Sequence, residues 1–302
     1  MSSITQNELV QLIAMSTAPD KKISTFKLID DIRLSGGISA VWEQRFSTTL
    51  FEDEIGRKLL EDANDVISRS KTADLRMLSC FDSDYPEQLA TIHEMPAVIW
   101  IKGILKAETK ALSVVGTRTP SEWALGYVAD LIKGLRNSEV TIVSGLALGV
   151  DTCAHTEALK HGMRTVAVLG NGLDISYPPT NINLQNKIAS EGMILSQFPP
   201  GFSPTKFSFP MRNAVMSGYS RSSLVVEAGE HSGTRIQGRL AIAHGRSVIL
   251  TQKVVDQTVW AKNLSKHPGV FVAQNVSEAI DLALEYSQPV PQVVRELISQ
   301  IV

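Results

Sequence analysis

The residues of this chain that could do chemistry lie in three polar turns, each of which contains glycine. Each turn follows a short apolar run and precedes a helical pattern, and the turns cover residues 116–121, 144–149 and 229–234. Glycine lets a backbone come close to a phosphate, and the N–H groups at a helix N-terminus attract an anion. Because ligands bind at the carboxyl edge of an open α/β sheet, where such turns meet, the three turns predict an anion-binding site there.

Four basic or aromatic side chains could hold such an anion. They are Arg118 in the first turn, and Lys206, Phe209 and Arg212 in a segment between the second and third turns. A guanidinium can grip a phosphate through two hydrogen bonds, and proteins that bind single strands combine cations with rings on which bases stack. We predict these four residues as DNA-binding. The simpler alternatives are a surface ion pair for the arginine and buried packing for the rings of Phe207 and Phe209.

The turns themselves are expected to shape the groove. The residues assigned to this role are Gly116, Ser144, Gly145, Gly149, Asn213, Ser232, Gly233 and Thr234. In the first turn, Thr119 and Glu122 have the spacing of a capping box, with Pro120 at the first helical position. The second turn is the weaker signal, because Asp151 would repel an anion and the two glycines do not form the G-x-G-x-x-G fingerprint.

The sequence contains no evident catalytic or metal-binding set. The six histidines lack the spacing of zinc ligands. Ser144 lacks the first glycine of a nucleophile elbow, and no serine, histidine and acid form a recognisable triad. We therefore expect no enzyme activity, no cofactor and no metal.

Composition and charge limit the class of protein. The chain has 302 residues, 43% of them hydrophobic, and its formal net charge of −2 argues against a uniformly basic nucleic-acid binder. Residues 202–253 nevertheless hold seven Lys and Arg against two acidic residues, so one cleft could focus a positive field. Two cysteines are too few for a disulfide framework. With no signal peptide and no apolar run of bilayer length, we expect a cytoplasmic protein without membrane contact.

Hydrophobic periodicity predicts the elements that position these turns. Residues 1–70 have apolar positions at helical spacing and are expected to form a small helical domain. Residues 71–287 alternate apolar strands with helices after a lead-in, which predicts a doubly wound, mostly parallel, Rossmann-like α/β sheet. The expected strands are 98–101, 111–116, 140–145, 164–170, 193–198, 222–228, 247–251 and 270–274, and the expected helices are 120–136, 149–161, 181–191, 211–219, 234–244, 256–265 and 276–286. Residues 288–302 are expected to be a C-terminal tail.

Several of these residues together resemble the DprA/Smf family of DNA-processing proteins. The resemblance rests on Gly116-Thr117-Arg118, Ser144-Gly145-Leu146-Ala147, Gly149 with Asp151 and Ala154-His155, Tyr177-Pro178, Phe209-Pro210 with Arg212-Asn213, Glu227-Ala228, and Ser232-Gly233-Thr234. It implies a Rossmann-like domain that binds single-stranded DNA, acts as a homodimer, and delivers the DNA to the RecA recombinase during natural transformation. The family's DNA-binding positions map onto Arg118, Lys206, Phe209 and Arg212.

The chain departs from the family pattern in three respects. Ala214 stands where the family usually has a second arginine after Arg-Asn, and Thr251-Gln252 replaces a common Pro-Gly. The winged-helix domain often found at the family's C-terminus is expected to be absent or reduced to a stub. We therefore expect a divergent member, and the sequence leaves transformation, recombination and defence open as its process.

Two other functions stay open beside binding of single-stranded DNA. A nucleoside-monophosphate phosphoribohydrolase would share the fold, but Gln237 stands where its motif has an acid, and an amide cannot act as nucleophile or general base. A sensor of a nucleotide signal would use the same cleft without turnover. The fold alone does not separate such a sensor from a DNA-binding protein.

Overall fold

One nine-stranded sheet organises the part of the chain that the structure describes. The computed structural model describes residues 4–17, 24–46, 50–107 and 110–288. The strand order is β1-β2-β6-β5-β4-β3-β7-β8-β9. The strands are β1 (Arg76–Ser79), β2 (Val98–Gly103), β3 (Ala111–Val115), β4 (Thr141–Ser144), β5 (Thr165–Leu169), β6 (Met193–Ser196), β7 (Ser222–Val225), β8 (Ser247–Thr251) and β9 (Val270–Ala273). Strands β3 to β9 pair in parallel, whereas β2 pairs antiparallel with both β1 and β6.

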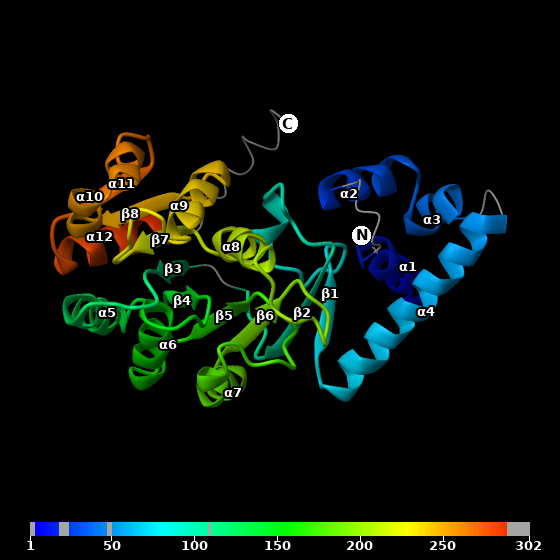
Figure 1. The fold of residues 1–302 in the computed structure, drawn as a ribbon, viewed down its shortest axis with the longest axis horizontal. Helices are drawn as coiled ribbons and strands as arrows, with labels where there is room; N and C mark the ends of the chain where they lie inside the picture. The colour runs from blue at the N-terminus through cyan, green and yellow to red at the C-terminus, as the bar shows by residue number, and fades with distance from the viewer. Residues whose placement is uncertain (1–3, 18–23, 47–49, 108–109, 289–302) are drawn as a thin grey trace.

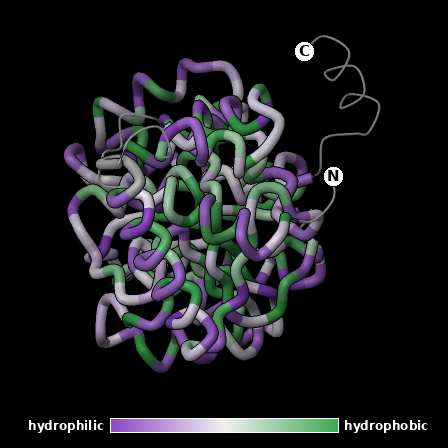
Figure 2. Tube along the Cα trace, turned by 90° about the vertical axis from the view of Figure 1, so that its right-hand side faces the viewer, coloured by the Kyte–Doolittle hydropathy of each residue, from purple (hydrophilic) through white to green (hydrophobic). Residues whose placement is uncertain are grey.

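Helices cover both faces of the sheet, so the predicted doubly wound, mostly parallel fold is confirmed (Figure 1). One face carries α5 (Glu122–Leu135), α6 (Val150–Lys160), α7 (Ile182–Glu191) and α12 (Val276–Tyr286), and the other carries α8 (Ser208–Tyr219) and α9 (Thr234–Ala243). Within β3, Leu112 and Val114 pack towards α5 and α6, whereas Val115 packs towards α8. Figure 2 shows hydrophobic segments through the middle of the trace and hydrophilic segments at many of the outer turns. Burial on both faces explains why these strands are continuous apolar runs.

Four helices precede the sheet in the chain. They are α1 (Gln6–Thr17), α2 (Thr25–Leu34), α3 (Ile38–Phe46) and α4 (Leu50–Thr72). Most of their buried apolar residues, including Leu12 and Ala63, form one cluster with Trp100 of β2. The indole Nε1 of Trp100 donates to Oγ of Ser70 at 2.9 Å, which fixes α4 to the sheet. The domain boundaries at residues 70 and 287 stay predictions, and nearly all of the expected tail at 288–302 lies outside the described residues.

The start of α5 differs from the sequence prediction. Its N-cap is Ser121, whose Oγ accepts a hydrogen bond from the N–H of Ala124 at 3.3 Å. The capping box predicted for Thr119 and Glu122 is therefore wrong. The physical reason is that the carboxylate of Glu227 holds Ser121 by both its N–H and its Oγ, each at 2.8 Å, and so sets where the helix begins.

Two other elements also differ from their expected bounds. Helix α8 begins at Ser208, three residues before the predicted start, so Phe209 and Arg212 lie on a helix. The single helix expected at 256–265 is two helices, α10 (Gln252–Gln257) and α11 (Val259–Leu264). Thr258 separates them, because its backbone is extended and its Oγ1 caps α11. Strand β1 was not predicted.

Candidate nucleic-acid interface

The first polar turn is packed closely against the start of α6. A Cβ at Gly116 would lie 2.5 Å from Cγ2 of Val150. Gly149 has a φ of +81°, and a Cβ there would lie 2.4 Å from the carbonyl oxygen of Thr117. The N–H of Val150 donates to that same carbonyl at 3.2 Å. The two glycines therefore let α6 support the turn that carries Arg118.

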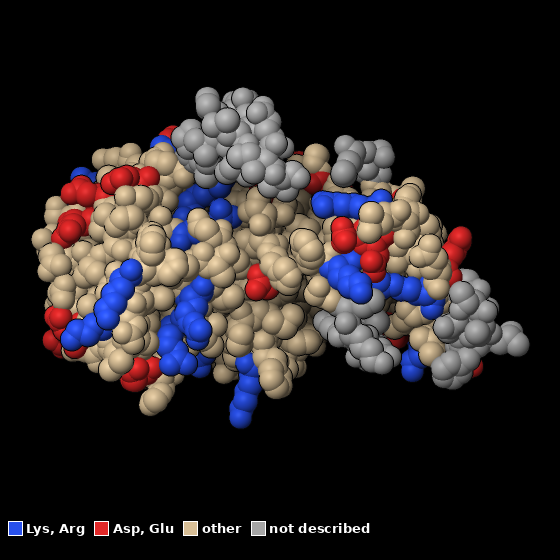
Figure 3. Space-filling model, turned by 90° about the horizontal axis from the view of Figure 1, so that it is seen from above, with Lys and Arg blue, Asp and Glu red and all other residues tan. Residues whose placement is uncertain are grey.

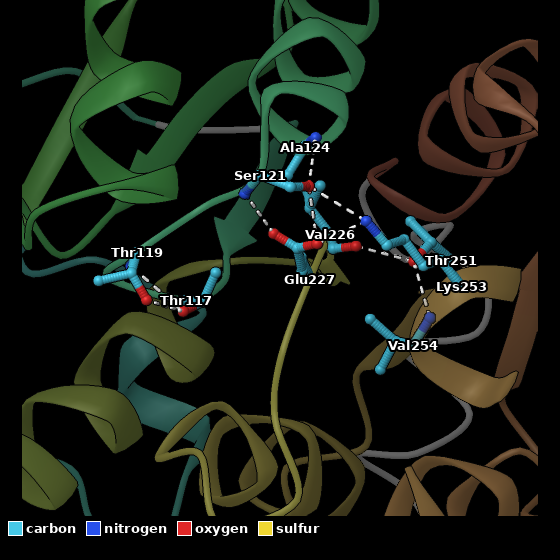
Figure 4. Close-up of polar contacts among 9 residues, drawn as sticks. All are labelled: Thr117, Thr119, Ser121, Ala124, Val226, Glu227, Thr251, Lys253 and Val254. Atoms are coloured by element: carbon cyan, nitrogen blue, oxygen red, sulfur yellow. Dashed lines mark hydrogen bonds and ion pairs between the residues drawn. The ribbon is translucent and has the colours of Figure 1, made fainter. Parts of the chain in front are cut away.

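Glu227 holds the same turn from the side of β7 (Figure 4). Its carboxylate accepts hydrogen bonds from Ser121, as described above, and from Nζ of Lys253 at 2.6 Å. Its carbonyl accepts from the N–H of Thr117 at 2.7 Å. Burial raises the pKa of Glu227, but the hydrogen bonds from Lys253 and Ser121 together outweigh it, so the pKa lies below its ordinary value. The turn that presents Arg118 is thus fixed on both sides of the arginine by one charged residue.

Arg212 is a buried arginine that depends on Gly145 for room. The side chain is 7% exposed, and its Nη1 lies 3.7 Å from Oδ2 of Asp151. The same Oδ2 accepts from the N–H groups of Gly145 at 3.1 Å and Ala147 at 3.4 Å. A Cβ at position 145 would lie 0.9 Å from Nη1. Asp151 therefore balances a buried cation, in contrast to the expectation that it repels an anion.

The ion pair between Arg212 and Asp151 leaves part of the guanidinium without a partner. Burial lowers the pKa of Arg212 and raises the pKa of Asp151, and their mutual attraction opposes both shifts. Nε and Nη1 of Arg212 are buried and have no hydrogen-bond partner in the described part of the chain. A buried donor left unpaired costs about 1–3 kcal/mol, and more for a charged group. The guanidinium is therefore poised to donate to an acceptor that a ligand brings.

Phe209 lies between Arg118 and Tyr177, and its ring is half-buried. The Cζ atom of the exposed Arg118 lies 5.4 Å from the ring centroid, within the range of a cation–π contact. The Tyr177 ring centroid lies 5.7 Å away, with the two planes at 40°. A Cβ at Gly170 would lie 3.2 Å from Cδ1 of Phe209, so the backbone supports the ring closely. Phe207, by contrast, is 82% exposed.

A cavity of about 590 Å³ opens between the turns at the carboxyl edge of the sheet. The predicted site residues that line it are Gly116, Arg118, Phe209, Arg212, Asn213, Ser232, Gly233 and Thr234. One wall is the N-terminus of α9, which has no acidic residue in its first turn. The hydroxyls of Ser232 and Thr234 lie 2.7 Å apart and hydrogen-bond each other. The structure thus brings together three of the four predicted DNA-binding residues.

The other predicted site residues lie outside this cavity. Ser144 is fully buried, and its Oγ donates to the carbonyl of Val114 at 2.6 Å, which joins β4 to β3. Gly145 lines a smaller pocket of about 60 Å³ that Phe209 also lines. Lys206 is exposed and lies three residues before Phe209. Figure 3 shows the molecule from the side of α8 and α9, where several Lys and Arg side chains are spread over the left half of the view.

Two polar residues among those that line the cavity without having been predicted as site residues are Gln237 and Glu230. Gln237 is 1% exposed, and its Oε1 has no hydrogen-bond partner among the described residues. Its position three residues after Thr234 on a helix, which places both on one face, is the sequence signal that could have found it. Glu230 also lines the cavity, but its Oε2 accepts from the N–H of Val259 at 2.8 Å.

His155 belongs to the family pattern but lies in the core. Its Nδ1 hydrogen-bonds Oγ1 of Thr165 at 2.7 Å, and burial lowers its pKa to about 3. Within the described ranges, no three His, Cys, Asp or Glu residues are grouped so that they could hold a metal ion. Nor do any of the helices that the structure describes combine the length and apolar character needed to cross a membrane.

The model of the family described as DNA recombination-mediator protein A matches residues 76–283. The chain belongs to this family. DNA processing protein DprA of Streptococcus pneumoniae is 42% identical over 171 residues, which are 56% of this chain and 60% of that protein. Protein Smf of Synechocystis is 34% identical over 228 residues, which are 74% of this chain and 57% of that protein. This chain spans less than two thirds of the length of these curated relatives.

Solved structures of family members share the fold. The X-ray structure of DprA from Streptococcus pneumoniae has a TM-score of 0.70 and 28% identity, covering 93% of this chain and 98% of that one. A DprA structure from Helicobacter pylori, described for its single-stranded DNA binding mode, has a TM-score of 0.62 and 25% identity, covering 70% of this chain and 96% of that one. These matches confirm the DprA/Smf resemblance and the Rossmann-like fold.

Proposed function

We propose that this protein binds single-stranded DNA at the carboxyl edge of its sheet, without chemical turnover. Arg118 and Lys206 hold phosphates, Phe209 stacks a base, and Arg212 supports both contacts from below. The observation that carries the proposal is the ring of Phe209, which is half-buried, has Arg118 at 5.4 Å and lies at the cavity that the buried Arg212 lines. Single-strand binders combine these two kinds of group, a cationic track and a stacking ring.

The biological role that we propose is the one that the resemblance to the DprA/Smf family implies. The protein delivers single-stranded DNA to a RecA-type recombinase, as a cytoplasmic homodimer and a recombination mediator. The description of the Helicobacter pylori relative, which concerns single-stranded DNA binding, supports the choice of ligand. Gln237 supports the absence of turnover, because an amide cannot serve as the acid of a phosphoribohydrolase.

A salt titration of binding to a labelled oligothymidine tests the proposal. Each phosphate neutralised contributes about −0.7 to the slope of log affinity against log salt for a single strand. Arg118→Ala should reduce the steepness of that slope by about 0.7 and weaken all sequences alike. Arg136→Ala is the matched control, because Arg136 is exposed at the far end of α5, near the opposite edge of the sheet.

Comparing the binding of single-stranded DNA, duplex DNA and mononucleotides separates the proposal from its alternatives. Single-stranded DNA should bind more tightly than duplex DNA. An Arg118→Ala protein with unchanged slope and affinity would overturn the assigned role of that arginine. Release of free base from AMP by the purified protein would overturn the absence of turnover.

A further inference from the structure

The cavity contains two buried polar groups with atoms that no described residue satisfies. Nε and Nη1 of Arg212 make no hydrogen bond within the described residues, although Nη1 lies 3.7 Å from Oδ2 of Asp151, and Oε1 of Gln237 is an acceptor without a hydrogen bond. The amide Nε2 of Gln237 donates to Oγ of Ser223 at 3.4 Å, so turning the amide over would still leave one of its ends free. Buried polar groups in folded proteins are nearly always hydrogen-bonded. The two side chains therefore point to a polar ligand that reaches the floor of the cavity.

The electrostatics of the floor favour an anion. The N-terminus of α9 forms one wall and carries the partial positive charge of its helix, with no acidic residue in the first turn. Arg212 adds a full charge. Of the two acids that line the cavity, Asp151 is paired with Arg212 and bonded to two backbone N–H groups, and Glu230 is bonded to the N–H of Val259.

The depth of these groups in the cavity favours a terminal phosphate of a nucleic-acid strand over a phosphate within the strand. Arg212, Thr234 and Gln237 are each less than 8% exposed, whereas Arg118 is exposed and Phe209 is half-buried. A phosphodiester carries a sugar on each side, so it cannot reach such a floor without drawing both neighbours in. A phosphate monoester can enter alone. The volume of about 590 Å³ lies within the usual range for a small-ligand pocket.

We propose that this cavity binds the phosphate monoester of a nucleotide. The phosphate lies against Arg212 and the N-terminus of α9, and the amide of Gln237, turned over so that Oε1 accepts from Ser223, donates Nε2 to the phosphate. The base lies beside Phe209 at the mouth. A free nucleoside 5′-monophosphate and the phosphorylated 5′ end of a DNA strand carry the same chemistry, and either can supply it. The strand-end source rests on the proposed function, since the rest of the strand then crosses the mouth of the same cavity.

Binding of matched ligands tests this inference. Affinity is measured for two oligothymidines that differ only in a 5′-phosphate or 5′-hydroxyl, and thermal shifts are measured with the four nucleoside 5′-monophosphates. We expect the phosphorylated strand to bind about tenfold or more tightly than the hydroxyl strand, as one additional charge-assisted contact implies. If a mononucleotide raises the melting temperature, the ligand is a free nucleoside 5′-monophosphate. If only the preference for the phosphorylated strand is seen, the ligand is the 5′ end of a DNA strand.

Gln237→Met connects the preference to the cavity. This variant should lose the preference for the 5′-phosphate and keep the affinity for the 5′-hydroxyl strand, because the proposed DNA contacts do not use Gln237. Gln257→Met is the control, since Gln257 is exposed at the end of α10. If Gln237→Met melts early without ligand, Gln237→Glu serves instead, because a negative charge at the floor should repel the phosphate alone. A variant that keeps the full preference overturns the inference.

Failure of this inference and failure of the proposed function give different results. Equal binding of the two strands with no mononucleotide shift overturns the inference, and salt-dependent binding of the hydroxyl strand then leaves the proposed function standing. A mononucleotide shift without oligonucleotide binding overturns the proposed function and supports the inference.

Discussion

The close approach of Gly145 to Arg212 makes Gly145→Ala a sharp test of the site. The new Cβ would lie 0.9 Å from Nη1 and 2.1 Å from Cζ of the guanidinium. Ordinary contact begins at 3.4 Å, so the guanidinium must move by about 2.5 Å or more. This movement breaks the ion pair with Asp151, whose Oδ2 lies 3.7 Å from Nη1, and it changes the position of the guanidinium in the wall of the cavity.

The displacement should lower both stability and DNA affinity. Removing one partner of a buried ion pair costs about 3–5 kcal/mol, which is an upper bound here because Arg212 is moved rather than removed. At about 2–4 °C per kcal/mol for a domain of this size, the melting temperature falls by at most roughly 6–20 °C. Loss of a hydrogen bond from a charged group is about 1.5–3 kcal/mol, so a single strand that carries a 5′-phosphate should bind roughly 10- to 150-fold more weakly.

A double-mutant cycle shows whether the methyl group acts through the arginine. If it does, Gly145→Ala has little further effect on DNA affinity in an Arg212→Ala background, so the two losses do not add. Gly126→Ala is the control, because Gly126 is exposed in α5 and a Cβ there meets nothing within 4 Å. That control should gain about 0.5–1 kcal/mol of stability. Wild-type affinity and melting temperature in Gly145→Ala, or additive losses in the cycle, would refute the reasoning.

Two further predictions concern pH. Glu227→Gln should cost about 1.5–3 kcal/mol at neutral pH. Because folding lowers the pKa of Glu227, its stabilisation exists above the ordinary value of 4.5 and disappears as the pH falls through the folded pKa, so melting curves of the two proteins should converge in acid. A gap that is independent of pH contradicts this. His155, with its pKa lowered by burial to about 3 from 6.5, stays neutral in the fold while the unfolded chain takes up a proton. Urea unfolding at pH 7, 6 and 5 should therefore show a loss approaching about 1.4 kcal/mol per unit below pH 6.5, and His155→Asn should reduce that loss; equal slopes would contradict it.

The central strands could be predicted well from the sequence, because the apolar residues that become buried lie within each strand segment itself. Residues 111–116 and 140–145 are mostly apolar and carry apolar side chains on both alternating sets of positions, as a strand covered on both faces must. Strand β1 lies at the edge of the sheet and begins with an exposed arginine, so its four residues show no such run. The start of α5 was also missed, because it depends on Ser121 meeting Glu227 across a large separation in the chain.

The site was predictable in its residue types and less so in their surroundings. Arg118, Phe209 and Arg212 stood out as basic and aromatic groups near turns, and the structure places them around one cavity. The burial of Arg212 and its pairing with Asp151 could not be predicted, because both depend on the bare backbone of Gly145. The alternation of Phe207 and Phe209 did not show which ring faces outward, because α8 begins between them, and only the family resemblance favoured Phe209.

The two ion pairs at this edge of the sheet differ in geometry, and the difference indicates which pair stabilises the fold and which serves ligand binding. In the pair of Glu227 and Lys253 the charged atoms lie 2.6 Å apart, and both carboxylate oxygens have donors. In the pair of Arg212 and Asp151 they lie 3.7 Å apart, and the guanidinium nitrogens Nε and Nη1 make no hydrogen bond with any described residue. Burial of a charge is costly, and a buried pair favours stability only when its geometry is good and its remaining donors are satisfied. The pair of Arg212 and Asp151 does not meet that condition by itself, whereas an anion in the cavity would accept hydrogen bonds from the remaining donors of Arg212. Its geometry is therefore better explained by binding than by folding, a cost in stability of the kind that functional sites often carry.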